Sequence, residues 1–312
     1  MDTATPAESL PHQSVLYQPI IHALHPQSPG FYVDGTLGAG GHARGILEAS
    51  SPAGKLLGLD LDPRALEIAR QHLQAFGSRA IIRQASYTTL QDQLWELGWT
   101  AVQGIVLDLG VSSMQLDQAE RGFSFQKDGP LDMRFSPQQT TTAAYLVNHL
   151  PEDELAEIIW RFGEEQQSRR IARAIVLARP LQTTLQLAEV IRKAIGGRGR
   201  LHPATLTFQA LRIAVNAELQ SIAQVLPQAV DALAPGGRLA VISFHSLEDR
   251  LVKQFFRRES RDCICPPQQP VCTCDHRARI IEIVRHPITA AEEEIQQNPR
   301  ARSARLRVIE KV

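Results

Sequence analysis

A glycine-rich segment near the N-terminus has the residue types and spacing of a turn that binds a small ligand. It follows a short apolar run and reads Asp34-Gly35-Thr36-Leu37-Gly38-Ala39-Gly40-Gly41-His42. Glycines let a backbone approach a ligand closely and adopt positive φ angles, and a helix that follows such a turn offers free N–H groups. The segment therefore predicts a ligand-binding turn between a strand and a helix.

Asp34 helps to decide which class of cofactor such a turn would hold. The spacing Gly38-x-Gly40-x-x-Ala43 also satisfies the dinucleotide fingerprint, and Asp60 lies about twenty residues further on, where a ribose-binding acid is expected. A pyrophosphate near the Asp34 carboxylate would be repelled by about 4 kcal/mol for unit charges about 4 Å apart at an effective dielectric constant of about 20. S-adenosylmethionine carries an ammonium and a sulfonium and no phosphate, so the order of acid and glycines favours it. A plain turn without a ligand is the alternative.

Two further residues are candidate cofactor contacts at the ends of the next predicted strands. Asp60 could accept hydrogen bonds from both ribose hydroxyls, or it could cap the helix that begins near Pro63. Asp62 fits that capping role better by position. Tyr87 could pack against the adenine ring, or it could be an ordinary half-buried aromatic residue.

Polar clusters at the ends of the fourth and fifth predicted strands are the candidates for chemistry. They read Asp108-Leu109-Gly110-Val111-Ser112-Ser113-Met114-Gln115 and Ser243-Phe244-His245-Ser246-Leu247-Glu248-Asp249-Arg250. Ligands bind at the carboxyl ends of strands in open α/β sheets, so both clusters should lie at one edge. The catalytic candidates are Asp108, Ser112, Ser113 and His245. Turn capping is the alternative for the Asp and Ser residues, and a structural role is the alternative for the His.

Four cysteines follow in the pattern Cys263-x-Cys265-x6-Cys272-x-Cys274, with His276 close behind. Four thiolates could form a tetrahedral zinc site, but the pairs are spaced C-x-C rather than C-x2-C. Thiols of a cytoplasmic protein can also stay reduced without a metal. The sequence leaves both interpretations open, and we assign no metal from it.

The elements that must position these residues can be predicted from the hydrophobic pattern. Short apolar runs alternate with helix-period stretches from residue 30 to about residue 110, which is typical of βαβ units and a parallel sheet. The predicted strands are 31–34, 55–60, 80–84, 104–109, 238–244, 279–285 and 304–309, the last two forming a closing hairpin. The predicted helices around them are 41–49, 63–76, 88–97, one long helix at 204–233, and 290–297.

The middle of the chain interrupts this alternation. Residues 111–135 are much longer than a usual connection from strand to helix and predict a loop that covers a site. Residues 140–196 have helical patterns without strands, including 152–162 and 168–179. The sequence therefore predicts an α/β, Rossmann-like fold of seven strands with an inserted all-helical domain.

Composition and charge narrow the function classes. The chain has 312 residues, 43% of them hydrophobic and 21% charged, which is typical of a globular protein. It has no apolar stretch of about eighteen residues and no signal-peptide pattern, so we expect a soluble, cytoplasmic protein without membrane contact. The net charge is zero, but residues 1–159 carry −9 and residues 160–220 carry +6. This asymmetry favours an anionic partner, although basic residues on solvated helices would give the same count.

Six long strings of this sequence resemble the bacterial 16S ribosomal RNA cytosine N4-methyltransferase family. They cover residues 33–47, 108–134, 163–175, 202–219, 236–253 and 298–308, and so span nearly the whole chain. The resemblance implies a class I methyltransferase that uses S-adenosylmethionine to methylate the exocyclic N4 of cytidine-1402 in 16S rRNA of the 30S subunit. It implies a catalytic domain at 1–112 and 218–312, and an inserted helical substrate-recognition domain at 113–217. The sequence leaves open whether the protein forms a homodimer.

The resemblance and the glycine turn together give the expected cofactor contacts. These are Asp34, Gly38, Gly40, Gly41, His42, Asp60, Tyr87, Asp108 and Gln115. Basic stretches at 169–170, 198–200, 257–261 and 300–307 are expected to contact the rRNA backbone. Two rival functions remain: an NAD-dependent oxidoreductase and a ribosome-assembly factor without catalytic activity.

Overall fold

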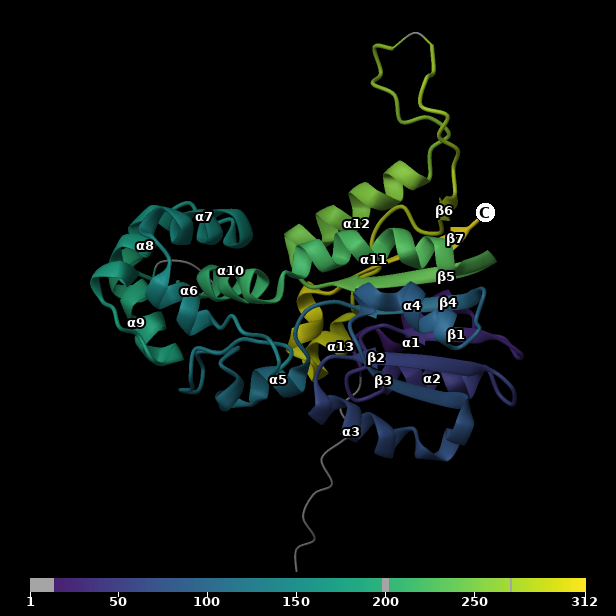
Figure 1. The fold of residues 1–312 in the computed structure, drawn as a ribbon, viewed down its shortest axis with the longest axis horizontal. Coiled ribbons are helices and arrows are strands. Elements are labelled where there is room, and N and C mark those ends of the chain that lie inside the picture. The colour runs from purple at the N-terminus through teal and green to yellow at the C-terminus, as the bar shows by residue number, and fades with distance from the viewer. Residues whose placement is uncertain (1–13, 198–201, 270) are drawn as a thin grey trace, which may run out of the picture.

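The computed structural model describes residues 14–197, 202–269 and 271–312, and its centre is one sheet of seven strands (Figure 1). The strands in chain order are β1 (Phe31–Asp34), β2 (Lys55–Asp60), β3 (Ala80–Gln84), β4 (Val102–Asp108), β5 (Leu233–Ser243), β6 (Ile280–Glu282) and β7 (Arg305–Lys311). Their order across the sheet is β3-β2-β1-β4-β5-β7-β6. The first five strands are parallel, and β7 runs antiparallel to both β5 and β6. The predicted seven-stranded α/β sheet with a closing antiparallel pair is confirmed.

Helices cover both faces of this sheet. They are α1 (Tyr17–Leu24), α2 (Gly41–Ala49), α3 (Pro63–His72), α4 (Leu90–Glu96), α11 (Glu218–Ala232) and α12 (Ser246–Glu259), and α13 (Glu292–Gln297) precedes β7. Val33 and Leu57 share an apolar core with α4, α11 and α12, whereas their neighbours Tyr32 and Leu56 share another with α1, α2 and α3. Because both faces are buried, these strands appear in the sequence as continuous apolar runs.

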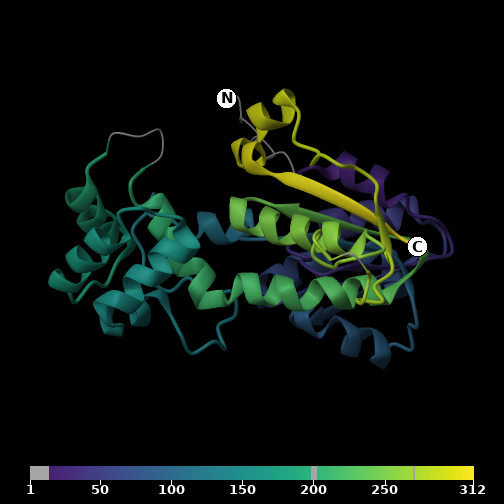
Figure 2. The ribbon, with the colours of Figure 1, turned by 90° about the horizontal axis from the view of Figure 1, so that it is seen from above.

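A second group of helices lies beside the sheet (Figures 1 and 2). It consists of α5 (Ser113–Asp117), α6 (Ala143–His149), α7 (Glu152–Gly163), α8 (Ser168–Leu177), α9 (Thr184–Ile195) and α10 (Thr205–Asn216). These helices enclose an apolar core of their own, to which Leu131 and Met133 of the long loop also belong. The loop at 111–135 is therefore anchored to the helical group. Phe123 stacks on Phe135 within the same core.

The prediction of one long helix at 204–233 is wrong, because the chain forms two helices there, α10 and α11. Ala217 stands between them in the left-handed region, with φ 49°. The side chain of Asn216 accepts a hydrogen bond from the Phe135 backbone N–H (2.8 Å) and donates one to the Met133 carbonyl (2.7 Å). The break thus ties the end of α10 to the loop that leads away from β4.

Smaller differences from the predicted boundaries have local causes. The helix predicted at 63–76 ends at His72 and is followed by a 3-10 segment in which Gly77 is not helical (φ 53°). The helix predicted at 88–97 is preceded by a 3-10 turn at Tyr87–Thr89. β5 begins at Leu233, earlier than predicted, because Leu233 already pairs with Val102.

Within residues 14–197, 202–269 and 271–312, none of the helices combines the length and the apolar character that crossing a membrane requires.

The left-handed alanine makes a direct test of the helix break. Ala217→Gly should raise the free energy of unfolding by about 0.5–1 kcal/mol, because glycine adopts this conformation without the steric cost of a Cβ atom. Ala217 is exposed, so the substitution removes little packing. Urea unfolding of both proteins measures the difference. Ala217→Val should be less stable than the parent, and a stabilised valine variant would contradict the assigned backbone conformation.

Candidate functional site

The candidate site lies where the parallel strands end. Asp34 ends β1, Asp60 ends β2 and Asp108 ends β4, while His245 follows the end of β5. β1 lies between β2 and β4, so the chain leaves β1 toward one side of the sheet and later returns to its other side. Open α/β sheets bind ligands at such a switch point. The structure thus brings the predicted acidic residues to one edge.

The glycine-rich segment forms the expected turn from β1 into α2. Gly38 and Gly40 have positive φ angles of 50° and 84°, and Gly40 is the residue that precedes the first turn of α2. An added side chain at either position would be strained in this backbone conformation. The turn therefore needs glycine for its path, and it leaves the first N–H groups of α2 facing the edge where the strands end.

Asp60 holds this turn in place. One oxygen of its carboxylate accepts a hydrogen bond from the Gly38 N–H (2.8 Å) and the other accepts one from the Asp62 N–H (2.8 Å). Asp62, not Asp60, caps α3 by accepting from the Arg64 N–H (3.0 Å). Each carboxylate oxygen has a second lone pair, so Asp60 retains acceptor capacity for ligand hydroxyls.

Two neighbouring acids, Asp34 and Asp108, give the site its charge preference. Burial raises the pKa of Asp34 to about 7, and the nearby Asp60 adds to this effect. Burial also raises the pKa of Asp108 well above its usual range, and the charges of Asp34 and Glu248 raise it further. Within the described part of the chain, Oδ1 of Asp108 is buried without a hydrogen-bond partner. A positively charged ligand would relieve this repulsion, whereas an anion would increase it.

His42 lies beside these acids in the first turn of α2. Its ring is buried, and burial lowers its pKa to about 4, so the imidazole is neutral at pH 7. Nε2 lies 3.0 Å from the Val15 carbonyl and must carry the proton, because a carbonyl only accepts. Nδ1 is then an acceptor, and it lies 3.9 Å from Oδ2 of Asp108. This arrangement suits a protonated Asp108.

The hydroxyl and amide candidates of the loop after β4 are engaged in local structure. Oγ of Ser112 accepts from the Gln115 N–H (3.2 Å), and Oε1 of Gln115 accepts from the Ser112 N–H (3.2 Å), which together form a capping box at the start of α5. Gln115 also donates to Asp62 (3.2 Å). Ser113 begins α5, and its side chain lies outside the described part of the structure.

Tyr87 packs against the apolar core that covers the α11 face of the sheet. Burial raises the pKa of its hydroxyl, which also has a hydrogen bond with Ser221 of α11. Its Cβ lies close behind the glycine turn, since a Cβ added at Gly35 would be 3.2 Å from it. The side chain therefore lies at the site while its hydroxyl is held by α11.

His245 belongs to a buried group of charges that sequence reasoning did not predict. Its Nδ1 accepts from the Glu248 N–H (3.4 Å) at the start of α12, and its Nε2 lies 3.1 Å from Oε1 of Glu248. Arg212 of α10 reaches this group: it donates twice to Glu218 (2.8 and 2.9 Å) and lies 3.9 Å from Oε1 of Glu248. We call these four residues the Arg212 cluster. It connects α10, α11 and α12 beside Asp108.

The charge of Arg212 explains why this cluster is better described as an ion-pair group than as a metal site. Three possible metal ligands lie together here: one side-chain atom each of Glu218, His245 and Glu248, all within 4.8 Å of one another. Burial alone would raise the pKa of Glu248, but the hydrogen bond and charge of His245, with the charge of Arg212, lower it below its usual range. A fixed guanidinium thus already supplies the positive charge that a metal would provide.

Comparison with known proteins agrees with this geometry. The sequence model of the MraW methylase family matches residues 9–312. Ribosomal RNA small subunit methyltransferase H of Dehalococcoides mccartyi is 52% identical over 303 residues, which cover 97% of this chain and 87% of that protein. The protein of the same name from Syntrophotalea carbinolica is 52% identical over 311 residues, which cover 98% and 99%. The chain belongs to the MraW methylase family.

A solved structure of an rRNA methylase from Streptococcus thermophilus is also similar, with a TM-score of 0.44 and 10% identity, covering 96% of this chain and 98% of that one. That likeness is too distant to support an argument about the site. Family membership makes the chain a methyltransferase, so the rival interpretation as an NAD-dependent oxidoreductase is dropped.

The arginines of the predicted RNA-contacting stretches differ in how far they are exposed to solvent. Arg169 and Arg170 of α8 are exposed, whereas Arg307 is buried and donates to Asp249 (2.7 Å). Arg305 pairs with the same carboxylate (3.2 Å). The expectation that residue 307 contacts RNA is therefore wrong. The predicted stretch at 198–200 lies outside the described residues.

Removing the cation of the Arg212 cluster should be costly. Arg212→Met should lower the free energy of unfolding of the methylase by about 3–5 kcal/mol, because it leaves two buried carboxylates without their partner. Urea unfolding measures this loss. Arg250→Met is the matched control, since it removes an exposed pair with Glu164 (2.8 Å) and should cost less than about 1 kcal/mol. Equal losses in the two variants would contradict the assigned role of Arg212.

Proposed function

We propose that this methylase transfers the methyl group of S-adenosylmethionine to the exocyclic N4 of cytidine-1402 in 16S rRNA, with the assembled 30S subunit as substrate. Relatives about half identical over nearly the whole chain are named for methylation of small-subunit ribosomal RNA. The observation that carries the proposal is the pair of buried, charge-coupled acids, Asp34 and Asp108, at the end of a glycine turn. This pair favours a cationic methyl donor.

The residues at the edge fit the separate parts of S-adenosylmethionine. Asp34 and the glycine turn (Gly38, Gly40, Gly41) lie where the charged methionine end would bind. The N–H groups of Gly38 and Gly40 already donate to Asp60 and to the Leu37 carbonyl, so these two glycines would shape the turn and not bind the ligand through their N–H groups. Asp60 has acceptor capacity for the ribose hydroxyls. Tyr87 would contact the adenine. The donor supplies an electrophilic methyl group on a sulfonium, and the described chain adds a neutral His42 beside Asp108.

The chain's own contribution to methyl transfer is to position a weak nucleophile. The cytosine amine is conjugated with its ring, so its lone pair must be aligned with the methyl group and its N–H groups must be held. Among the described residues, Oδ1 of Asp108 and Oε1 of Glu248 are buried without a hydrogen-bond partner. Oε1 of Glu248 lies 3.1 Å from Nε2 of His245 and 3.9 Å from Arg212, so Asp108 is the residue to accept the amine hydrogen bond. His245 is fixed by Glu248 and would position the loop after β5.

The helical insertion at 113–217 would recognise the rRNA. It has its own apolar core, and contacts across to the rest of the chain place it at the carboxyl edge of the sheet: Glu164 after α7 accepts from Ser246 (2.5 Å) and Arg250 (2.8 Å) of α12. The exposed side chains of Arg169, Arg170 and Arg173 on α8 offer cations for phosphate contacts.

The direct test is methyl transfer with labelled S-adenosylmethionine and 30S subunits that lack this modification, followed by digestion and mapping of the labelled nucleoside. Label in N4-methylcytidine at position 1402 supports the proposal. Label at another nucleotide would overturn the assigned target, and binding of subunits without transfer would favour an assembly factor. Free 16S rRNA in a parallel reaction tests whether the assembled subunit is required.

The raised pKa of Asp34 predicts that cofactor affinity depends on pH. With a pKa of about 7, this carboxyl is mostly protonated at pH 6 and half ionised at pH 7, and only the ionised form attracts a cation. S-adenosylmethionine should therefore bind about fivefold more tightly at pH 7 than at pH 6, with proton release. Calorimetry in buffers of different ionisation enthalpy measures both quantities. Asp34→Asn should bind more weakly with a flat profile, and a flat profile in the parent protein would contradict the assignment.

Substituting the acid at the end of β4 should separate chemistry from folding. Asp108→Asn keeps the shape of the side chain but replaces a carboxyl group, which can ionise when a cation binds, with an amide that cannot. Single-turnover methyl transfer should therefore fall by at least about a hundredfold. Glu120→Gln is the control, because Glu120 forms an exposed pair with Arg64 and should leave the rate nearly unchanged. Near-normal transfer by Asp108→Asn would show that another group holds the amine.

A further inference from the structure

A long arm of irregular structure leaves the sheet between α12 and β6. Its described residues, 261–269 and 271–279, extend away from both the sheet and the helical group (Figure 1). None of its described residues is buried, and Val271 near its tip is 70% exposed. Loops of this length without helices or strands are uncommon in compact proteins and usually have a function. The described residues of the arm belong to none of the three apolar cores, so another interaction must order it.

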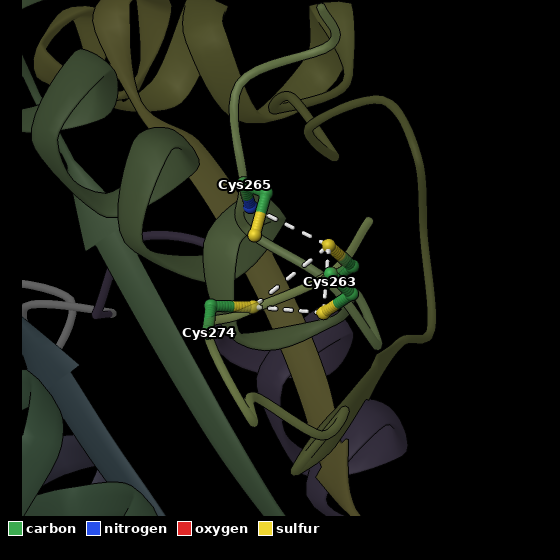
Figure 3. A group of neighbouring side chains, drawn as sticks. Cys263, Cys265 and Cys274 are labelled. Atoms are coloured by element: carbon green, nitrogen blue, oxygen red, sulfur yellow. Dashed lines mark hydrogen bonds between the residues drawn. The ribbon is translucent and has the colours of Figure 1, made fainter. Parts of the chain in front are cut away.

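The four cysteines of the chain meet in this arm (Figure 3). Sγ of Cys272 lies 3.5 Å from Sγ of Cys263 and 3.6 Å from that of Cys274, and the sulfurs of Cys263 and Cys274 are 3.8 Å apart. Cys265 completes the group, with all four sulfurs within 4.8 Å of one another. A disulfide would need about 2.05 Å between sulfurs. Four sulfurs around one zinc ion at about 2.3 Å are about 3.8 Å apart in a tetrahedron.

Backbone N–H groups point at these sulfurs. Ile264 donates to Sγ of Cys274 (3.4 Å), and Thr273 donates to Sγ of Cys265 (3.5 Å). Cys265 donates to Sγ of Cys263 (3.4 Å). Such bonds stabilise the negative charge of metal-bound thiolates and orient them. The hydrogen bonds from Ile264 and Thr273 connect the two C-x-C segments, so each segment stabilises the position of the other.

We propose that Cys263, Cys265, Cys272 and Cys274 bind one structural zinc ion. Four thiolates form a closed site with no position for a substrate, which is typical of structural rather than catalytic zinc. The neighbouring His276 is not part of the site, because its Nδ1 lies 2.9 Å from the Arg261 carbonyl and its Nε2 lies 3.8 Å from Oε1 of Glu259, so both ring nitrogens are at the base of the arm. Sulfurs this close leave room for a single ion, and soft thiolate ligands select zinc over magnesium or calcium.

The ion would order the tip of the arm without contributing much to the sheet. The base of the arm is held independently, since Arg279 pairs with Glu259 (3.3 Å) and also with Asp231. Removing the metal should therefore release residues near the cysteines and leave the global unfolding transition almost unchanged. This inference does not depend on the proposed methyl transfer.

The test uses the full-length, untagged protein, purified under reducing conditions without chelators. Elemental analysis should give about one zinc per chain, and metal-free protein should take up one Zn²⁺ in competition with a chromophoric chelator. Co²⁺ in place of Zn²⁺ should give the absorption of a tetrahedral thiolate site. Cys272→Ser and Cys274→Ser should lose the metal, and Thr273→Ser, a control in the same arm, should keep it.

Several outcomes would overturn the zinc site. They are failure of the reduced, metal-free protein to take up Zn²⁺, iron in place of zinc, or unchanged zinc content in both cysteine variants. Trypsin should cut at Arg261 or Arg277 about tenfold faster after zinc removal, and an unchanged rate would refute the ordering of the arm. A protein that binds zinc but does not methylate subunits would support the zinc site and reject the methyl transfer, so the two failures are distinguishable.

Discussion

Burial of negative charge at the end of the parallel strands is the constraint on which the site depends. Asp34 and Asp108 end adjacent strands, and neither can be ionised without cost while the other is charged in a site of low polarity. The main-chain N–H of Thr36 offsets part of this cost for Asp34 (3.1 Å), but the described chain offers no such partner to Oδ1 of Asp108. This repulsion lowers the stability of the folded protein, and a bound cation would relieve it. The edge therefore favours a positively charged donor.

The same edge must also meet the helical group, and polar contacts fix that junction. Asn216 holds the loop after β4 through Met133 and Phe135, while Arg212 links α10 to the start of α11 and of α12. Ala217 could not sit in the left-handed region on its own preference, because alanine favours a continuous helix. Hydrogen bonds of about 1 kcal/mol each, together with the buried ion pair, outweigh the cost of that backbone conformation.

How much could be predicted from the sequence follows from the range of the interactions involved. Asp34, Asp60 and Asp108 follow apolar runs directly, so a local pattern places them at one edge of a parallel sheet. The glycines at positions 38 and 40 predict the turn because they are also a local pattern, and both have positive φ angles in the structure. Arg212 and Glu218 could not be placed in this way, although they are only six residues apart. Their pairing depends on the helix break at Ala217, and that break is held by contacts of Asn216 with Met133 and Phe135, which are distant in the chain. The role of Ser112 as a cap also needed the structure, because sequence allows both a cap and a catalytic hydroxyl.

The cysteine arm shows why spacing rules have limits. The C-x2-C rule describes two thiolates that one short segment supplies to the same ion. In this chain the N–H groups of Ile264 and Thr273 reach sulfurs of the opposite C-x-C segment, so the two halves complete each other. The shorter spacing is then compatible with a tetrahedral arrangement, because the geometry is set by the pair of segments and not by either one. A search that scores each segment alone would miss such a site, whereas the distances between sulfurs identify it.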